Sequence, residues 1–414
     1  MLGRRLIHLV GLDDIPRPLV PLLVVDALGS IAFSNFFVYV AIWGKDRLHA
    51  TDTQLGIAFL LSALAGAFAG AFGGALSDRI GRKPVIVIGW SATVAVAVVA
   101  LAAGDRTLLG LGAFVVVSAV AAIGHGADTA LVADLVPPEA RERSFAAVRL
   151  TGNLGGVLGP SIGALALALA GWSALFATAA ALGVAATIIG IRYLPARGAY
   201  SPPEHERERN SFRVLFTDLR FGAFWMASVM QYVVYAMYET LLPVSLTQSH
   251  GYSPAAWGVI SGLNPLMVVL FQLRITRWSS RTAGAAFRLA VATLLMGLPF
   301  LLLDVSSAIP VVILLIIVFV IGEMLWVPTG QAVAERMSPP SMRGAYLGAF
   351  SASGAMAFAL GPLAGLQVRE RAGDSAVWTF TAILSVIVAA LILLIVRRLP
   401  NHGDGPAVSN PEPT

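Results

Sequence analysis

Long apolar runs separated by short polar segments constrain the fold of this chain more than any other feature of its sequence. A membrane-spanning helix needs about 20 predominantly apolar residues, and 57% of the 414 residues are hydrophobic. Breaking the chain at charges, prolines and turn-forming residues gives twelve runs of that length. They cover 19–43, 53–76, 84–103, 108–136, 144–170, 172–194, 221–246, 254–276, 282–303, 309–331, 342–367 and 375–396. The sequence therefore predicts an all-α membrane protein with twelve transmembrane helices.

Lysine and arginine are distributed unevenly among the polar segments. With the N-terminus in the cytoplasm, most of them fall in cytoplasmic segments, and the outer loops hold only Lys45, Arg47, Arg106, Arg369 and Arg371. Cytoplasmic loops of membrane proteins carry such an excess of positive charge, so we expect both termini to be cytoplasmic. The same asymmetry explains the net charge of +5 without a nucleic-acid partner.

A repeated pattern divides the chain into two halves. PPEAR and GPSIG in the first half recur at the same spacing as PPSMR and GPLAG in the second. The intervening segment holds three prolines and many charges, which is the composition of a solvated linker. We predict two pseudo-symmetric six-helix bundles, at 1–194 and 221–398. A cytoplasmic linker at 195–220 joins them, and a disordered cytoplasmic tail follows at 399–414. Parallel repeats of this kind place a substrate site near the bilayer midplane between the halves.

A cluster of charge interrupts the apolar pattern between the second and third runs. This segment, GGALSDRIGRKP at 73–84, resembles the loop 2–3 signature of the major facilitator superfamily, G-x-L-x-D-R-x-G-R-[KR]. Further segments resemble its 12-helix drug:proton antiporter family, which contains bacterial multidrug exporters. They are Asp26-Ala-Leu-Gly29 in the first run, the antiporter motif Gly155-x-x-x-Gly159-Pro160-x-x-Gly163 in the fifth, Leu242-Pro243 in the seventh and Gly322-Glu323-Met324 in the tenth. An arginine that many members carry in the fourth run is missing here.

The resemblance implies a cytoplasmic gate built on this charged loop. Gly74 and Gly81 tolerate the tight turn between two helices. The family pattern implies that Asp78 contacts the start of the eleventh span and that Arg82 contacts Asp134, as bridges between the halves while the cytoplasmic side is closed. The candidate gate residues are Gly74, Asp78, Arg79, Gly81, Arg82 and Asp134. The alternative is that these charges only set the topology.

Three carboxylates lie inside predicted spans, namely Asp26, Glu239 and Glu323. Ionisable side chains are costly within a membrane and usually mark functional positions. Because burial makes a carboxylate bind a proton more readily, these residues are candidates for proton coupling, and a cationic substrate could compete for them. Structural hydrogen bonding is the alternative for each.

Aromatic and polar side chains surround two of these carboxylates along the sequence. Tyr232 and Tyr235 precede Glu239 on one helix face, and Trp326 follows Glu323 by one turn. Aromatic faces beside carboxylates suit lipophilic cations, and Asn264 in the eighth span could add a hydrogen bond. Ordinary helix packing explains each aromatic residue equally well.

A further polar group is expected where the fourth and fifth spans meet. His125 and Asp128 share one helix face, and Arg149 lies on the adjoining span. An Asp128–Arg149 ion pair would neutralise both charges, with His125 as a proton relay. A purely structural pair is the alternative, and without a third ligand we expect no metal site.

These observations favour a secondary active transporter that exports lipophilic, cationic small molecules in exchange for protons by alternating access. The alternatives are a proton-coupled transporter of a nutrient or sugar and, from another class, a membrane enzyme or lipid-handling protein. No nucleophile–base cluster or phosphate-binding loop supports an enzyme or ATP drive. We expect no cofactor, a proton gradient as the energy source, a monomer in the inner (cytoplasmic) membrane, and only small molecules, protons and lipid as partners.

Overall fold

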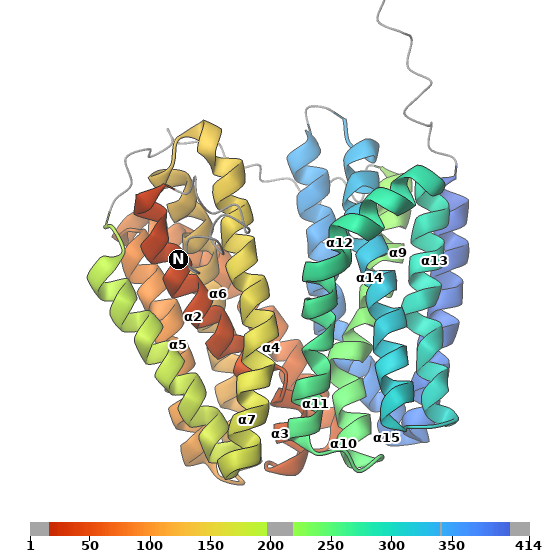
Figure 1. Cartoon of the computed structure of the whole chain (residues 1–414), viewed down its shortest axis with the longest axis horizontal. Helices are drawn as coiled ribbons and strands as arrows, with labels where there is room; N and C mark the ends of the chain where they lie inside the picture. The colour runs from red at the N-terminus through yellow and green to blue at the C-terminus, as the bar shows by residue number, and fades with distance from the viewer. Residues whose placement is uncertain (1–15, 197–217, 340–341, 398–414) are drawn as a thin grey trace, which may run out of the picture.

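The computed structural model describes residues 16–196, 218–339 and 342–397. The described residues form helices joined by short turns. The helices gather into two groups that correspond to the N-terminal and C-terminal halves of the chain (Figure 1). The predicted tail at 399–414 and most of the predicted linker lie outside the described residues, so the domain boundaries stay a prediction.

The N-terminal half is built mainly from long helices. Its elements are η1 (Arg17–Leu19), α2 (Val20–Phe37), α3 (Val40–Asp46), α4 (Asp52–Ile80), α5 (Arg82–Ala103), α6 (Thr107–Leu135) and α7 (Pro138–Tyr193). The backbone of α7 leaves the helical region at Ala170 and Gly171, and Gly171 has a φ of 68°. Since glycine adopts this conformation without a Cβ clash, the chain reverses there and α7 consists of two arms.

The C-terminal half contains more interrupted helices. Its elements are α9 (Leu219–Ala236), the π-helical turn η2 (Met237–Leu241), α10 (Leu242–Gln248), α11 (Pro254–Ser261), α12 (Leu263–Thr282), α13 (Ala285–Gly297), the 3₁₀ segment η3 (Leu298–Asp304), α14 (Ile309–Met337) and α15 (Arg343–Val396). Gly373, with a φ of 79°, divides α15 into two arms. The two broken helices therefore occupy equivalent places in the two halves.

The described residues are helical through the body of each of the twelve predicted ranges. Among the described residues, nine helical segments are long and apolar enough to cross a membrane. Two of these nine are the two-armed segments at Leu150–Tyr193 and Tyr346–Val396. The all-helical membrane fold is confirmed, whereas the twelve crossings and the cytoplasmic position of the termini stay predictions.

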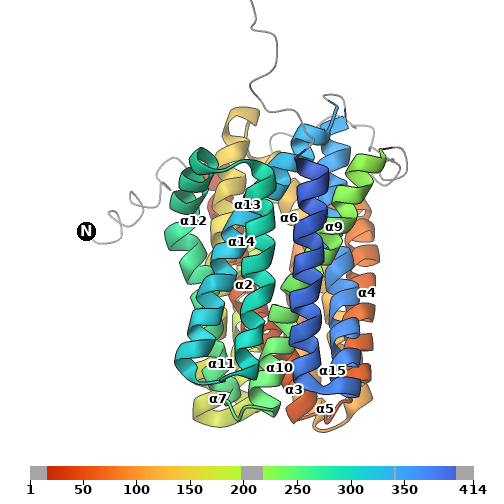
Figure 2. The same cartoon turned by 90° about the vertical axis from the view of Figure 1, so that its right-hand side faces the viewer.

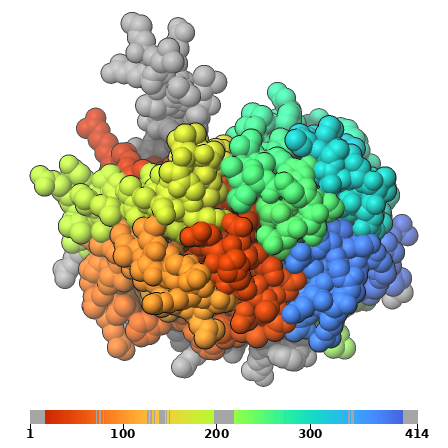
Figure 3. Space-filling model, turned by 90° about the horizontal axis from the view of Figure 1, so that it is seen from below, coloured from red at the N-terminus to blue at the C-terminus, as the bar shows by residue number. Residues whose placement is uncertain are grey.

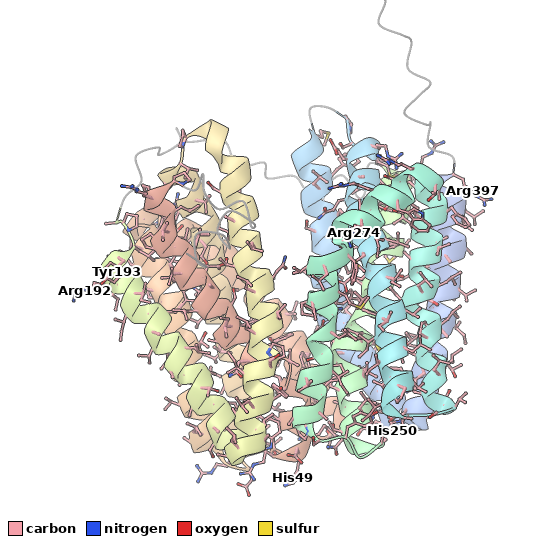
Figure 4. The ribbon with its side chains drawn as sticks, viewed as in Figure 1. His49, Arg192, Tyr193, His250, Arg274 and Arg397 are labelled. Atoms are coloured by element: carbon pink, nitrogen blue, oxygen red, sulfur yellow. The ribbon has the colours of Figure 1, made fainter. Side chains whose placement is uncertain are left out.

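The two ends of the molecule differ in charge and in contacts. Arg274 and Arg397, from segments predicted to be cytoplasmic, lie toward one end, and His49 and His250 lie at the other (Figure 4). We call the end with the two histidines the outer end. Close to it, α3 contacts α10, and the first arm of α7 contacts α11 and α12.

The halves pack tightly against each other toward the outer end. Helix α4 runs beside α15 (Figure 2), and a Cβ on Gly56 would lie only 2.8 Å from the Cα atom of Leu363. Figure 3, which looks onto this end, shows α3 and the start of α4 packed against segments of the C-terminal half (green and blue). The hydrogen bonds that join described residues of the two halves all lie here, between Asp52 or Thr53 and Arg369 or Glu370.

Candidate functional site

Glu323 of α14 is held by two neutral donors. The hydroxyl of Tyr235 donates to its Oε1 at 3.3 Å, and Nδ2 of Asn264 donates to its Oε2 at 2.8 Å. Among the described residues, Glu323 forms no ion pair with lysine or arginine. Helices α9, α12 and α14 thus converge on one half-buried carboxylate, and binding a proton is the direct way to neutralise it.

Glu239 lies in an irregular turn that the sequence analysis did not predict. Pro243 lacks the amide that would bond to the carbonyl of Glu239, and the chain before it widens into the π-helical turn Met237–Leu241. Such turns occur frequently at functional sites. The turn directs Glu239 toward the N-terminal half, since this side chain lines a cavity with Ser34 and Pro160.

The two glutamates share a neighbour. Asn264, which donates to Glu323, also lines the cavity of about 190 Å³ next to Glu239. Because like charges repel at short range, this pair is less stable with both carboxylates ionised than with one protonated.

The aromatic residues predicted for this site do not have equal access to it. Tyr235 reaches Glu323 directly. Tyr232 packs edge-on against Trp326 with ring centroids 6.4 Å apart, and Trp326 is fully buried. In this conformation Trp326 supports the site through packing and does not expose a ring face to a cavity.

A second and larger cavity, of about 1130 Å³, lies mainly within the N-terminal half. We call it the N-half cavity. Asp26 and Asp128 both line it, and the hydroxyl of Thr151 donates to Oδ2 of Asp26. Asp128 is 3% exposed, and its Oδ1 accepts no hydrogen bond from a described residue. The side chains of His125 and Arg149 lie outside the part of the chain described, so the three-residue polar network stays a prediction.

The glycines of the antiporter motif pack the first arm of α7 against α2. A Cβ on Gly155 would lie 2.6 Å from the carbonyl carbon of Ser30, and one on Gly159 would lie 2.7 Å from the backbone nitrogen of Asn35. A Cβ on Gly163 would meet Asn35 as well. Only hydrogen fits at these positions, so the motif has a packing function here; its role in antiport stays a prediction.

Pro160 of the same motif takes part in the contact between the halves. The hydroxyl of Tyr39 donates to the carbonyl oxygen of Pro160 at 2.7 Å. Gly258 of α11 lies directly over this pair, because a Cβ there would come within 1.5 Å of the Tyr39 hydroxyl and 3.0 Å of the Pro160 oxygen. The outer end can close this tightly only because residue 258 has no side chain.

The predicted cytoplasmic gate is described in part. Gly81, with a φ of 94°, ends α4 and begins α5, as its expected role in the turn requires. Nε of Arg82 donates to Oδ2 of Asp134 at 3.3 Å, and Nη1 donates to Ser77 at 2.6 Å. Arg79 is exposed, whereas the surroundings of Gly74 and the side chain of Asp78 lie outside the part of the chain that the structure describes.

One expectation about this gate needs correction. Arg82 begins α5 and Asp134 ends α6, so their contact connects helices of the same half. The Arg82–Asp134 ion pair is present although, at the end opposite the outer end, no hydrogen bond joins described residues of the two halves. The Arg82–Asp134 pair therefore orders the N-terminal bundle and does not itself bridge the halves.

Sequence reasoning missed a polar network at the outer end. Arg369 bonds to Asp52 of the other half and, through Nε, to Asp374 at 2.6 Å. Nζ of Lys45 binds Asp52 at 2.7 Å, and Glu370 accepts hydrogen bonds from Thr53. These residues were counted only as loop charges, because partners 317 positions apart along the chain show no pattern in one sequence.

Comparison with known families identifies the fold. The model described as "Major Facilitator Superfamily" matches residues 22–329 and 224–413. The chain belongs to the major facilitator superfamily. Solved structures agree on the fold: the nucleoside transporter NupG aligns with a TM-score of 0.78 at 16% identity, over 92% of this chain and 100% of that one. A POT family transporter in complex with a thioalcohol conjugated peptide aligns with a TM-score of 0.76 at 15% identity, over 94% and 98%.

Curated relatives of this superfamily member are named multidrug resistance protein MdtH. The protein of Enterobacter sp. (strain 638) is 27% identical over 333 residues, which cover 79% of this chain and 80% of the relative. The protein of Salmonella typhimurium is 26% identical and the protein of Klebsiella pneumoniae (strain 342) is 27% identical. Both alignments also cover 79% of this chain and 80% of the relative. The family and the apolar helices together show a multi-pass membrane transporter, as the sequence predicted, rather than an enzyme.

Proposed function

We propose that this transporter exports lipophilic, cationic compounds in exchange for protons across the inner membrane of a bacterial cell. The observation that carries the proposal is Glu323, a membrane-embedded carboxylate bonded to Tyr235 and to Asn264, which also lines the cavity next to Glu239. A carboxylate with neutral donors and no described basic partner can alternate between charged and protonated forms. The names of the relatives support drug efflux.

The position of Glu239 supports coupling to alternating access. Its cavity is closed on one side by Ser34 and Pro160 of the N-terminal half. Rocking of the halves would therefore change which side of the membrane reaches this carboxylate. No bound cofactor is required in this proposal, because the proton gradient supplies the energy.

Transport by the purified protein in proteoliposomes tests the proposal. An imposed pH gradient should drive ethidium or tetraphenylphosphonium against its concentration gradient, and Glu323→Gln and Glu239→Gln should each abolish the gradient-driven part. Asp105→Asn, which changes an exposed carboxylate at the outer end, serves as the matched control. Transport that ignores the pH gradient, or full coupling in both glutamine variants, would refute the proposal.

The structural neighbours include nucleoside and peptide transporters. At this level of identity the likeness concerns the fold alone. Nucleosides and dipeptides therefore belong in the same assay as comparison substrates, and gradient-driven movement of one of them without any movement of cations would favour the nutrient alternative.

A further inference from the structure

The N-half cavity is separate from the glutamate pair. Its lining comes from the N-terminal half except for Thr240 and Phe358, whereas Glu239 lines the smaller cavity with Asn264. Ser34 and Phe37 line both. Two acidic cavities thus adjoin each other, and the proton-coupling proposal uses only the smaller one, which is lined by both halves.

Asp128 is the side chain of the N-half cavity that most favours a bound cation. Its carboxylate is 3% exposed, and Oδ1 has no hydrogen-bond donor among the described residues. A buried carboxylate whose oxygen has no donor is costly unless it binds a proton or a cation comes close to it, and a cation bound in the cavity would favour the charged form. Asp26 lies in the same cavity, so the polar part of the lining suits a positive charge and repels an anion.

The remaining lining defines what kind of cation would fit. Aromatic rings of Phe33, Trp90 and Phe145 line the cavity and can bind a cation or an apolar ring system. The volume of about 1130 Å³ suits a drug-sized molecule. A bare metal ion is disfavoured, because the described residues contain no group of three or more metal-ligating side chains.

Two glycines provide the space in this cavity. Gly66 and Gly70 have the four-residue spacing of small residues that lets helices approach closely. Yet a Cβ on Gly66 would stay 3.7 Å from its nearest neighbour and one on Gly70 3.6 Å, which are ordinary contact distances. Both residues line the N-half cavity. Packing does not demand glycine here, and a larger side chain at either position would fill the cavity.

We propose that the N-half cavity is a binding site for bulky organic cations, in which Asp128 faces the positive charge and Gly66 and Gly70 set the size limit. The inference rests on the proposed export of cations and locates their site. The substrate then binds beside the proton-coupling glutamates without replacing the proton on Glu323. Substrate and proton are exchanged because both sites respond to the same movement of the halves.

Equilibrium binding of radiolabelled tetraphenylphosphonium to the full-length protein in lipid nanodiscs tests this inference. Asp128→Asn, which keeps shape and removes charge, should weaken binding at least tenfold. Gly70→Leu should weaken it by a similar factor through size alone. Gly112→Leu is the matched control, because Gly112 of α6 has open space around it and does not line the cavity.

The outcomes separate this inference from the proposed function. Monodisperse gel filtration first shows that each variant is folded, and Gly70→Leu keeps the test valid if Asp128→Asn fails to fold. Wild-type affinity in Gly70→Leu, the absence of any binding to the wild-type protein, or loss of binding in Glu323→Gln as large as in Asp128→Asn would overturn the site. Intact, Asp128-dependent binding without proton-driven transport would leave the site standing and refute only the proposed antiport.

Discussion

Nη1 of Arg369 donates to both carboxylate oxygens of Asp52, at 3.1 Å and 2.9 Å, and thereby joins α15 to the start of α4. Asp52 is 5% exposed and Arg369 is 14% exposed, so water screens this pair only weakly. Removing Arg369 breaks the bond between the halves but leaves Asp52 paired with Lys45, so the cost lies below the about 3–5 kcal/mol of a fully unpaired buried charge. The contact is the main charged connection between described residues of the two halves.

Arg369→Gln should therefore open the outer end. The chain contains no cysteine, so spin labels attached at Asp105→Cys and Val305→Cys are the only ones on the protein. Double electron–electron resonance between the two labels then measures the distance between the halves. We expect a longer distance to become the dominant population in Arg369→Gln. Arg371→Gln, which changes an exposed neighbouring arginine, should leave the distribution unchanged; equal effects in both variants would contradict the prediction.

Asp374 should make this closure sensitive to acid. It directly follows Gly373, where the two arms of α15 meet. Although burial by itself raises the pKa of the Asp374 carboxyl, hydrogen bonds from Ser249 and Ser245 and the charge of Arg369 hold that pKa below its ordinary value. A lowered pKa means that the stabilisation is complete above about pH 4 and is lost as the pH falls through the lowered value.

The measurable consequence is a label distance that stays constant from about pH 8 to pH 5 and lengthens only below about pH 4. Asp374→Asn should remove most of this acid-dependent change, because the titrating group is gone. A distance that instead changes near neutral pH in the wild-type protein, or an unaltered acid response in the asparagine variant, would show that another group controls the outer end.

Gly159→Ala should destabilise the N-terminal bundle. Its Cβ would meet the Cβ of Ser34 at 2.6 Å and the backbone of Asn35 at 2.7 Å, and backbone atoms cannot move aside cheaply. Forced overpacking of this kind costs about 1–3 kcal/mol. The expected result is a lower Tm in detergent. Gly152→Ala, on the same helix with open space around it, should keep or raise the Tm, and an equal loss in both variants would point to helix propensity and not to packing.

Gly258→Ala should act on the conformational equilibrium rather than on the stability of one half. The new Cβ would collide with the hydroxyl of Tyr39, which belongs to the other half. The substitution therefore destabilises the conformation in which the outer end is closed. We expect a longer distance between the two spin labels. Tyr39→Phe in the same background should partly restore closure, since it removes the nearest atom but leaves the ring at 2.6 Å. No difference between the single and double variants would exclude the Tyr39 contact as the cause.

Much of the fold was predictable from local pattern. Apolar runs of membrane-spanning length and the turns between them follow from composition alone, because a backbone in lipid must satisfy its own hydrogen bonds. Gly81 was likewise predictable as a turn residue, since its positive φ is a local property. Asp26, Glu239 and Glu323 stood out for the same kind of reason, as charges inside apolar segments.

Other features of the site needed the tertiary structure. The π-helical turn at Glu239 was not predicted, although Pro243 was a local signal for it. Trp326 follows Glu323 by one turn, yet it is fully buried, because neighbouring helices decide which face of α14 stays open. Gly66 and Gly70 have the spacing of a packing motif but line a cavity, since a spacing cannot reveal whether a second helix faces it.

The sequence by itself determined the membrane class, the helical segments, the charge asymmetry and the chemical identity of the buried acids. Only the tertiary structure decided that Asp52 meets Arg369, that Gly258 lies over Tyr39 and that Asp128 lines a separate cavity. The physical reason is that hydropathy and backbone geometry act over one or two helical turns. Contacts between the halves join residues more than a hundred positions apart and depend on how whole helices pack.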